Sequence, residues 1–580
     1  LNIFLRSPSL QSLAVATATS AFCASDLIKN LIKIIQHNPC EHLLMNKTFL
    51  ILLWIYWLFL SCHSNNDEPV KSRPNILFIM ADDHAYQAIS AYNDKLINTP
   101  NIDRIANEGL LFLNACVTNS ICAPSRAVIL TGKHSHINGK IDNRFPFDTT
   151  NITFPKILHE HGYQTAMFGK LHFGNNPKGF DEFKILPGQG NYYNPDFITK
   201  KNGIIHLEGY TTDIITDMTL NWLDTERDST KPFFLAYLHK APHRRWLPAP
   251  RHYQDYIHKT FPEPETLFDD YSGRGQAAAS AEMNIFTHMD WSADSKVYPD
   301  VMDQLNIPET SSRDKRSFFS TVGRQTPAQR AEWDAVYRPM NEEFIRQYPA
   351  MSKKELMRWR YQRYMQDYLG CIAAVDEGVG KVLDYLDQHN LTENTIVVYT
   401  SDQGFYLGEH GWFDKRFIYN ESFKTPLLVR WPGVIKEGTR NSQMVQNLDY
   451  AQTFLEAAGI NPPEDMQGES LIPLFKGDTV HFRDAVYYHY YEYPAIHMVK
   501  RHYGIVTKDY KLVHFYFDVD EWELYDRKKD KNEMKNVYND PAYTEVVKDL
   551  KEKLAGLRIK YKDSEQLDQK YIDLYQLSEQ

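Results

Sequence analysis

Short apolar segments that alternate with amphipathic stretches constrain the fold of this chain more than any other feature. The alternation starts at Arg73 and is typical of a mixed or parallel sheet covered by helices. Three of the apolar segments, 75–80, 233–238 and 395–400, run directly into acidic, basic or imidazole side chains. Ligands of open α/β sheets bind beyond the carboxyl ends of the strands, so these three ends predict one shared site.

Composition limits the classes of partner. The chain has 580 residues, of which 43% are hydrophobic and 24% charged, which is ample for a large globular core. Its formal net charge of -10 argues against nucleic acid as a partner, and an anionic ligand would need a local basic site. Six cysteines in a chain of this length do not form a disulfide framework.

The first 73 residues predict export rather than a folded domain. Residues 1–44 show no domain pattern, and we expect them to come from an over-extended reading frame with Met45 as the true start. Residues 45–62 resemble a lipoprotein-type signal peptide that ends in L-S-C, with Cys62 as the lipidated residue, and 63–73 form a polar tether. We therefore expect an exported bacterial lipoprotein, in the periplasm or on the cell surface, that meets the membrane only through its lipid anchor. A plain signal peptide is the alternative.

The rest of the chain is expected to divide into two parts. A main domain at 74–475 carries an insertion at about 251–350, which we expect to form loops and short helices. Residues 351–386 within it predict one or two helices with a break near Gly370. The C-terminal part at 476–580 has aromatic-rich, strand-like runs that predict a small antiparallel sheet, followed from Tyr543 by one amphipathic helix.

The most specific motif is S-I-C-A-P-S-R at 120–126, completed by L-T-G at 130–132. A proline suited to the first turn of a helix follows Cys122, so this thiol would lie at a helix N-terminus. Such a position lowers the pKa of a thiol and offers backbone N–H groups to an anion. For Cys122 alone, a semi-buried structural cysteine is the alternative.

The whole motif resembles the signature of the type I sulfatases. That resemblance implies an α/β fold, an alkaline-phosphatase-like sandwich with a smaller C-terminal α+β subdomain. It also implies that Cys122 is oxidised to formylglycine (3-oxoalanine) by a formylglycine-generating enzyme or an anaerobic sulfatase-maturating enzyme. One hydroxyl of the hydrated aldehyde would attack sulfur, and collapse of the resulting hemiacetal would release sulfate, a route that serine lacks.

The resemblance also implies a metal site. Asp82 and Asp83 follow one predicted strand, and Asp402 and Gln403 follow another. Together with the group derived from Cys122 they make a set of oxygen ligands, which suits Ca²⁺, or less well Mg²⁺, rather than zinc. For the first two carboxylates alone, caps of following helices are the alternative.

Further motifs supply the expected catalytic groups. The segment G-K-L-H resembles the second sulfatase signature, with leucine in place of the usual tryptophan, and implies that Lys170 binds sulfate and His172 assists elimination. The segment K-A-P-H implies that His243 protonates the leaving oxygen. Arg126 and Lys415 complete the set, because cations stabilise the equatorial sulfate oxygens.

Substrate-binding candidates rest on weaker patterns. Lys240 and Arg416 flank the expected catalytic groups, and an aromatic-rich segment near the C-terminal strands adds His489, Glu492, His497 and His502. An aromatic core with satisfied histidines is the alternative for that segment.

The expected function is hydrolysis of sulfate esters on a sulfated oligo- or polysaccharide. Several segments resemble bacterial carbohydrate sulfatases that act on N-acetylglucosamine 6-sulfate or heparan fragments, and algal polysaccharides are equally open. One alternative is a phosphonate or phosphodiester hydrolase of the same superfamily. The other is a non-catalytic glycan-binding lipoprotein.

Overall fold

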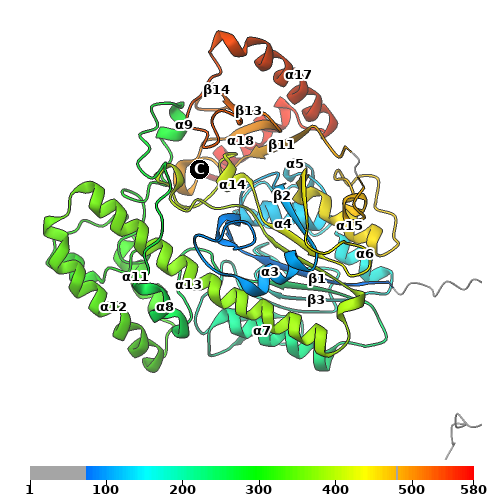
Figure 1. The fold of residues 1–580 in the computed structure, drawn as a ribbon, viewed down its shortest axis with the longest axis horizontal. Helices are drawn as coiled ribbons and strands as arrows, with labels where there is room; N and C mark the ends of the chain where they lie inside the picture. Colours follow the sequence, from blue (N-terminus) through cyan, green and yellow to red (C-terminus); the bar gives the residue numbers. More distant parts are fainter. Residues whose placement is uncertain (1–72, 479–480, 580) are drawn as a thin grey trace, which may run out of the picture. The chain divides into compact units, whose positions relative to one another are not determined.

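The computed structural model describes residues 73–478 and 481–579, drawn as coloured ribbon in Figure 1. The segment expected to be over-extended, the signal peptide and almost all of the tether lie outside these residues. Among the helices that are described, none combines the length and apolar character needed to cross a membrane.

A ten-stranded mixed sheet forms the centre of the main domain (Figure 1). Strands β8, β1, β7, β3 and β4 run parallel to one another, whereas β9 runs antiparallel to both of its neighbours. In order across the sheet, the strands are β10 (Thr439–Gln446), β2 (Leu110–Cys116), β9 (Leu427–Arg430), β8 (Thr395–Ser401), β1 (Asn75–Ala81), β7 (Phe233–Leu238), β3 (Gln164–Gly169), β4 (Glu182–Ile185), β5 (Asp196–Thr199) and β6 (Gly203–His206).

Helices cover both faces of this sheet, which explains why its central strands are apolar throughout. Along β1, Leu77 and Ile79 pack into one core and Ile76 and Phe78 into the other. The first face is covered by α3 (Pro100–Asn107), α7 (Thr211–Asn221) and α13 (Lys353–Gln388). The second is covered by α4 (Cys122–Thr131), α6 (Phe154–Glu160) and α15 (Tyr450–Ala457). The short helices α5 (Ser135–Asn138), α14 (Asn420–Phe423) and α16 (Ile472–Phe475) join these elements. The expected α/β sandwich is confirmed.

Helix α13 is continuous, so the expectation of a break near Gly370 is wrong. Its glycines serve close packing instead. A Cβ on Gly370 would lie 2.9 Å from Cγ of Pro248, and one on Gly378 would lie 2.6 Å from Oγ1 of Thr216 in α7. Because neighbouring segments approach the helix backbone at these positions, a side chain has no room there.

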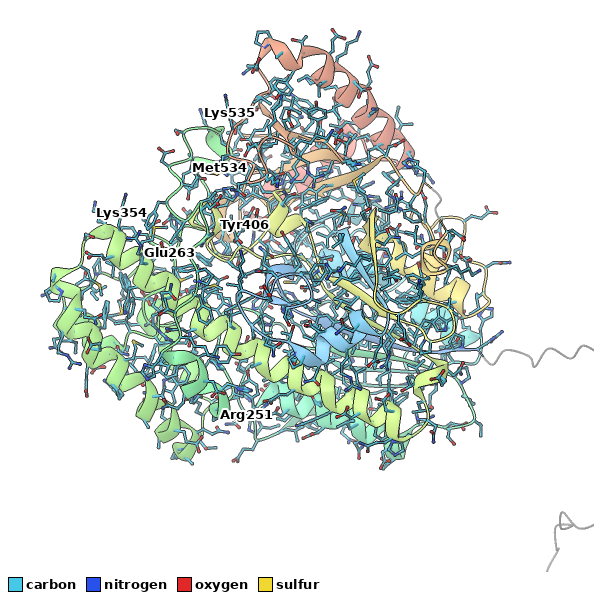
Figure 2. The ribbon with its side chains drawn as sticks, in the orientation of Figure 1. Arg251, Glu263, Lys354, Tyr406, Met534 and Lys535 are labelled. Carbon is cyan, nitrogen blue, oxygen red and sulfur yellow. The ribbon has the colours of Figure 1, made fainter. Side chains whose placement is uncertain are left out.

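The inserted region contains one long helix in addition to the short ones that we expected. Thr326 and Gln329 form a capping box at the start of α12 (Pro327–Gln347), and Trp333 stacks on Tyr337 one turn later. Nearby at the surface lies Arg251, which is labelled in Figure 2. It forms ion pairs with Asp213 of α7 and Glu377 of α13. The other helices of this region are α8 (Tyr253–Ile257), α9 (Gln276–Ala279), α10 (Pro299–Gln304) and α11 (Asp314–Val322).

A four-stranded antiparallel sheet forms the C-terminal part (Figure 1), in the order β11 (Ala485–Tyr490), β12 (His502–Thr507), β13 (Tyr510–Phe515) and β14 (Glu521–Asp526). One face packs on residues 405–423 of the main domain. The other face packs on α17 (Thr544–Lys560) and α18 (Glu565–Glu579). The expectation of one helix from Tyr543 is therefore wrong, and the chain turns between the two helices at Lys562, whose φ is +60°.

Candidate active site

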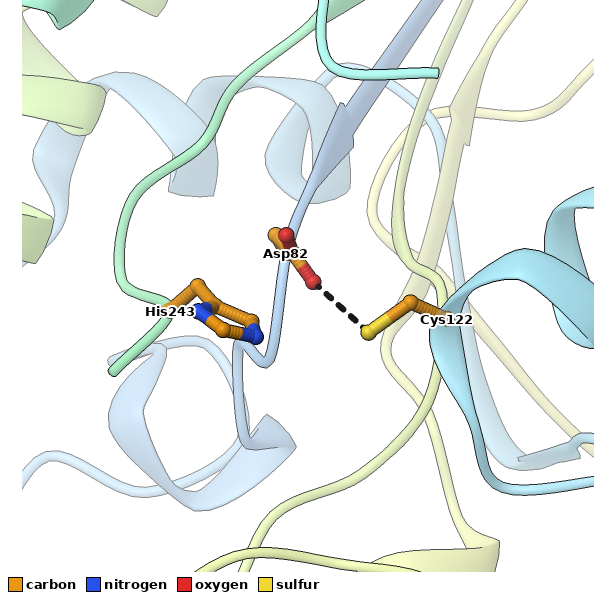
Figure 3. A group of neighbouring side chains, drawn as sticks. All are labelled: Asp82, Cys122 and His243. Atoms are coloured by element: carbon orange, nitrogen blue, oxygen red, sulfur yellow. Dashed lines mark hydrogen bonds between the residues drawn. The ribbon is translucent and has the colours of Figure 1, made fainter. Parts of the chain in front are cut away.

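The ends of separate strands bring the predicted polar residues together. Asp82 directly follows β1, and Cys122 begins α4, which follows β2. The Cys122 thiol donates a hydrogen bond to Asp82 Oδ1 at 3.4 Å, and His243, on the loop after β7, lies beside the same carboxylate (Figure 3). The parallel strands thus deliver three sequence-distant motifs to one edge of the sheet, as their polar ends predicted.

Three carboxylates form the floor of the site. One oxygen each of Asp82, Asp83 and Asp402 lies within 4.8 Å of the other two, and all three side chains are buried. Burial, together with the charges of the two neighbouring carboxylates, raises the pKa of Asp83 to about 7 despite nearby Lys415. The amide oxygen Oε1 of Gln403 is also buried, with no hydrogen-bond partner. Crowded carboxylates beside an orphaned amide oxygen fit a hard divalent cation.

Three cations surround this floor. Arg126 Nε lies 3.0 Å from Asp402 Oδ2, and Lys415 Nζ lies 2.7 Å from Asp83 Oδ2. Lys170 forms an ion pair with Asp82. Burial would raise the pKa of Asp82, but the charges of Lys170 and Arg126 hold it well below its usual value. The cations are placed to bind an anion that enters the site from above the carboxylates.

The two histidines of the site are held neutral. His243 Nε2 lies 3.8 Å from Asp83 Oδ2, and burial and the charge of Lys170 lower the pKa of its ring well below the usual value. Burial, again with Lys170, also lowers the pKa of His172, whose Nδ1 has no hydrogen-bond partner. Both rings are therefore unprotonated in the resting site, and a nearby negative charge is needed before either can hold a proton.

The unmodified thiol is a poor nucleophile in this position. Cys122 is 0% exposed, and burial together with the charge of Asp82 raises its pKa far above the usual value. The expectation that the helix N-terminus lowers the thiol pKa is thus wrong, because desolvation and the neighbouring carboxylate outweigh the helix. Nucleophilic catalysis at this residue therefore requires a group other than the unmodified cysteine thiolate.

A cavity of about 650 Å³ opens onto the site. The predicted residues that line it are His172, Lys240, His243, Lys415, Arg416, Glu492 and His497. Burial and the charge of Lys170 lower the pKa of Lys240 to about 7. Its lining also includes Arg144, Arg244 and Arg245, so cations outnumber the two carboxylates, Asp414 and Glu492. The cavity supplies the local basic site that an acidic protein needs for an anionic substrate.

His489 and His502 do not line the cavity, so the structure does not support their predicted role in substrate binding. His489 Nδ1 lies 2.9 Å from Asp563 Oδ2, and Nε2 lies 2.7 Å from the Tyr516 hydroxyl. His502 Nε2 accepts a hydrogen bond from the Ile418 N–H at 3.1 Å. Both rings are buried, and their nitrogens are occupied by protein groups, which was the alternative for this segment.

Comparison with known proteins identifies the family. The family model described as "Sulfatase" matches residues 74–460, and one described as "N-sulphoglucosamine sulphohydrolase, C-terminal" matches residues 408–560. The chain belongs to the sulfatase family. It is therefore a sulfuric ester hydrolase, and members of this family use a formylglycine and a divalent metal.

Individual relatives of this sulfatase agree with that assignment. It is 45% identical to an N-acetylglucosamine-6-O-sulfatase of Bacteroides thetaiotaomicron over 94% of each chain. It is 25% identical to an ulvan-active sulfatase of Formosa agariphila, over 73% of this chain and 70% of the relative. A solved sulfatase in complex with its substrate D-glucosamine-2-N,6-O-disulfate superposes with a TM-score of 0.80 at 47% identity, over 85% of this chain and 99% of that one.

A more distant neighbour shares only the fold. A phosphonate monoester hydrolase from Silicibacter pomeroyi superposes with a TM-score of 0.60 at 19% identity, over 84% of this chain and 96% of that one. The sulfatase interpretation is thus confirmed over the phosphonate or phosphodiester hydrolase and over a non-catalytic binding protein.

Several residues of the sulfatase cavity were not identified from the sequence. Gln189 accepts a hydrogen bond from Lys170, and Asp414 pairs with both Arg416 and His497. Asp414 adjoins the predicted Lys415, so its place in the motif was a usable signal. Arg244 and Arg245 lie in segment 239–246, whose resemblance to carbohydrate sulfatases was a second signal. No pattern pointed to Asn143, Arg144 and Asn191, which lie on irregular segments.

Proposed function

We propose that this sulfatase removes the 6-O-sulfate from a glucosamine residue of a sulfated saccharide. The observation that carries the proposal is the cation-lined cavity of about 650 Å³ beside His172, His243 and Lys415, which suits a sulfated sugar. The relative at 45% identity is named for N-acetylglucosamine 6-O-sulfate, and the solved neighbour holds a glucosamine 2-N,6-O-disulfate. Both sugars are glucosamines with sulfate at oxygen 6.

We propose a separate catalytic role for each group of side chains around the floor of the site. Arg126, Lys170 and Lys415 hold the non-bridging sulfate oxygens and stabilise the charge that develops on them. A bound sulfate group raises the pKa of neighbouring His243, so that its ring can carry a proton to the leaving sugar oxygen. His172 is neutral in the resting site and takes a proton when sulfate is released.

The nucleophile and metal are proposed as a formylglycine derived from Cys122 and a Ca²⁺ ion. Asp82, Asp83, Asp402 and Gln403 would hold the metal, which Mg²⁺ fits less well because it demands a tighter octahedron. The metal supplies Lewis acidity at the nucleophile, and the hydrated aldehyde supplies a hydroxyl that a thiol lacks. Around the substrate, Lys240, Arg416, Glu492 and His497 orient the sugar.

Two accessory events complete the proposal. A formylglycine-generating or anaerobic sulfatase-maturating enzyme converts Cys122, and the L-S-C sequence directs lipidation of Cys62 and export to the periplasm or cell surface. Mass spectrometry of the mature N-terminus tests the second event. A diacylglycerol on Cys62 supports it, and a chain that starts elsewhere without lipid contradicts it.

The decisive experiment is sulfate release from a panel of saccharides. The panel comprises the 6-sulfates of N-acetylglucosamine and N-acetylgalactosamine, glucosamine-2-N,6-O-disulfate, and ulvan and carrageenan oligosaccharides. Wild type is expected to release sulfate from the 6-sulfated glucosamines, and Cys122→Ala and Cys122→Ser to release none while unfolding at the wild-type temperature. Turnover by the serine variant would contradict the formylglycine mechanism, and release from the other sugars alone would contradict the substrate.

A further inference from the structure

A second cavity, of about 370 Å³, lies where the edge of the large sheet meets the C-terminal sheet. Its lining comes from β2, β10, β11 and β12, and from the segments that follow α14 and β14. It shares no lining residue with the first cavity, of about 650 Å³. It is therefore a separate site, to which the proposed function assigns no role.

The lining of this second cavity is strongly cationic. It includes Lys424, Arg483, Lys508 and Arg527, against a single carboxylate, Asp484. That carboxylate lies 2.8 Å from His481, and among the described residues it forms no ion pair with any of the four cations. In a chain with a net charge of -10, four cations around one small cavity favour an anionic occupant.

Protein groups satisfy these cations only in part: Arg483 pairs with Asp449, and Arg527 Nη1 donates to the Thr507 carbonyl at 2.6 Å. Arg483 Nη2 lies 2.7 Å from Asp449, but its Nη1 is buried without a hydrogen-bond partner, as is Nε of Arg527. Among the described residues, neither Lys424 nor Lys508 forms an ion pair, and Lys424 Nζ lies 4.9 Å above the Tyr86 ring. A buried donor without an acceptor costs stability, so an anion in this cavity would be bound with little competition from the protein.

The electrostatic environment of Lys424 and the uncharged polar groups of the lining also bear on what this cavity can bind. Burial, with the charge of Arg527, lowers the pKa of Lys424, although nearby Glu421 and Glu533 oppose the shift. Ser442 and Gln443 add uncharged polar groups to the same lining. Lysine and arginine donors around a small cavity match an oxyanion with several acceptor oxygens.

We propose that this second cavity binds a sulfate group, carried either by free inorganic sulfate or by a glycan chain as a sulfate ester. The shared chemistry is a tetrahedral oxyanion held by Lys424, Lys508 and the two arginines. The volume exceeds that of a bare ion and accommodates part of a sugar. The site would thus give the protein a contact with sulfate that is independent of the reacting group.

The test counts sulfate sites by equilibrium dialysis of radiolabelled inorganic sulfate at constant ionic strength. Wild type should bind two ions per chain, and the double variant Lys424→Gln/Lys508→Gln should bind one. The control Lys535→Gln/Lys548→Gln removes two exposed lysines that lie outside the cavity and should still bind two; Lys535 is labelled in Figure 2. Equal counts in wild type and in the cavity variant, or a site lost in the control variant, would overturn the proposal.

Kinetics separate the two sources of the sulfate group. With a monosaccharide substrate, kcat/KM should be equal in wild type and both double variants. If a glycan sulfate is the ligand, KM for a sulfated tetrasaccharide should rise about fivefold in the cavity variant at unchanged kcat, as for loss of one charge-assisted hydrogen bond. An unchanged KM together with the lost dialysis site would identify free sulfate. The dialysis count needs no turnover, so failure of the proposed reaction and failure of this site are distinguishable.

Discussion

His243 lies beside two carboxylates of the floor, with Nε2 3.8 Å from Asp83 Oδ2 and a ring nitrogen within 4.8 Å of an Asp82 oxygen. A ring placed there to protonate the leaving oxygen matters most when that oxygen is a poor leaving group. His243→Ala should therefore lower kcat/KM for a sugar sulfate by about 10²- to 10⁴-fold. It should change kcat/KM far less for an aryl sulfate. Parallel assays of both esters test whether His243 is the general acid. Equal losses of kcat/KM on the two esters would indicate a binding role instead.

His489 and His497 allow a matched comparison between a structural and a substrate-facing histidine. His489 is fixed by Asp563 and Tyr516, so His489→Ala should lower the free energy of unfolding by about 2 to 4 kcal/mol and leave KM unchanged. His497 lines the cavity, so His497→Ala should raise KM. Chemical denaturation and steady-state kinetics on both variants test this, and the reverse pattern would contradict the placement of the two rings.

At the level of single residues, the sequence predicts those site residues that lie within continuous sequence motifs. Cys122, Arg126, Lys170 and His243 each lie in such a motif, and the structure brings them together. His489 could not be placed in this way, because successive side chains of β11 point to opposite faces of the sheet. Tyr488 packs toward the main domain and Tyr487 toward α17, and the sequence does not say which face meets the cavity.

At the level of elements, α13 offers a test of glycine as a packing residue. Glycine-to-alanine changes usually stabilise a helix by about 1 kcal/mol. A Cβ on Gly378 would lie 2.6 Å from Thr216 Oγ1 and 2.7 Å from the Tyr237 hydroxyl, so Gly378→Ala should instead destabilise the fold by about 1 to 3 kcal/mol. Gly556 in α17 has nothing within 4 Å of the same position, and Gly556→Ala should be stabilising. Urea unfolding of both variants checks the signs, and two changes of the same sign would refute the packing argument.

The same helix shows why some elements were predicted and others not. The apolar segments at 75–80, 233–238 and 395–400 became β1, β7 and β8, because burial on both faces leaves a continuous apolar run. Gly370 was taken as a helix breaker because propensity ignores neighbours, and Pro248 supplies the reason for glycine only in the folded chain. The turn at Lys562 carries no glycine or proline signal of its own.

For the whole molecule, the three buried carboxylates couple metal binding to stability. Ca²⁺ at about one hundred times its Kd should stabilise the folded protein by about 2.7 kcal/mol and raise its unfolding temperature, because the ion binds only the assembled site. Scanning calorimetry with EGTA and then with added CaCl₂ measures the shift, and MgCl₂ should give a smaller one. Asp83→Asn should abolish the shift, whereas Asp520→Asn, at an 88% exposed side chain, should keep it. If added Ca²⁺ leaves the unfolding temperature of the wild type unchanged, the metal site is excluded.

The global arrangement was predictable only as a class. The alternating pattern and the cysteine motif together pointed to a helix-covered sheet with a smaller C-terminal part, and that class is confirmed. The order of the strands was not readable. Asn75 pairs with Thr395, and β9 runs against its neighbours, because such pairings depend on packing between segments that no local pattern connects.

The distance along the chain between the partners of Cys122 has a consequence for biosynthesis. Gln403 lies 281 residues after this cysteine. At about 5 to 20 residues per second, a ribosome needs about 15 to 55 s to make that stretch. During this interval the thiol has none of the later strands around it, whereas in the finished protein it is wholly enclosed. Under the proposed oxidation of Cys122, translation speed would therefore set how long the maturating enzyme has to reach the thiol.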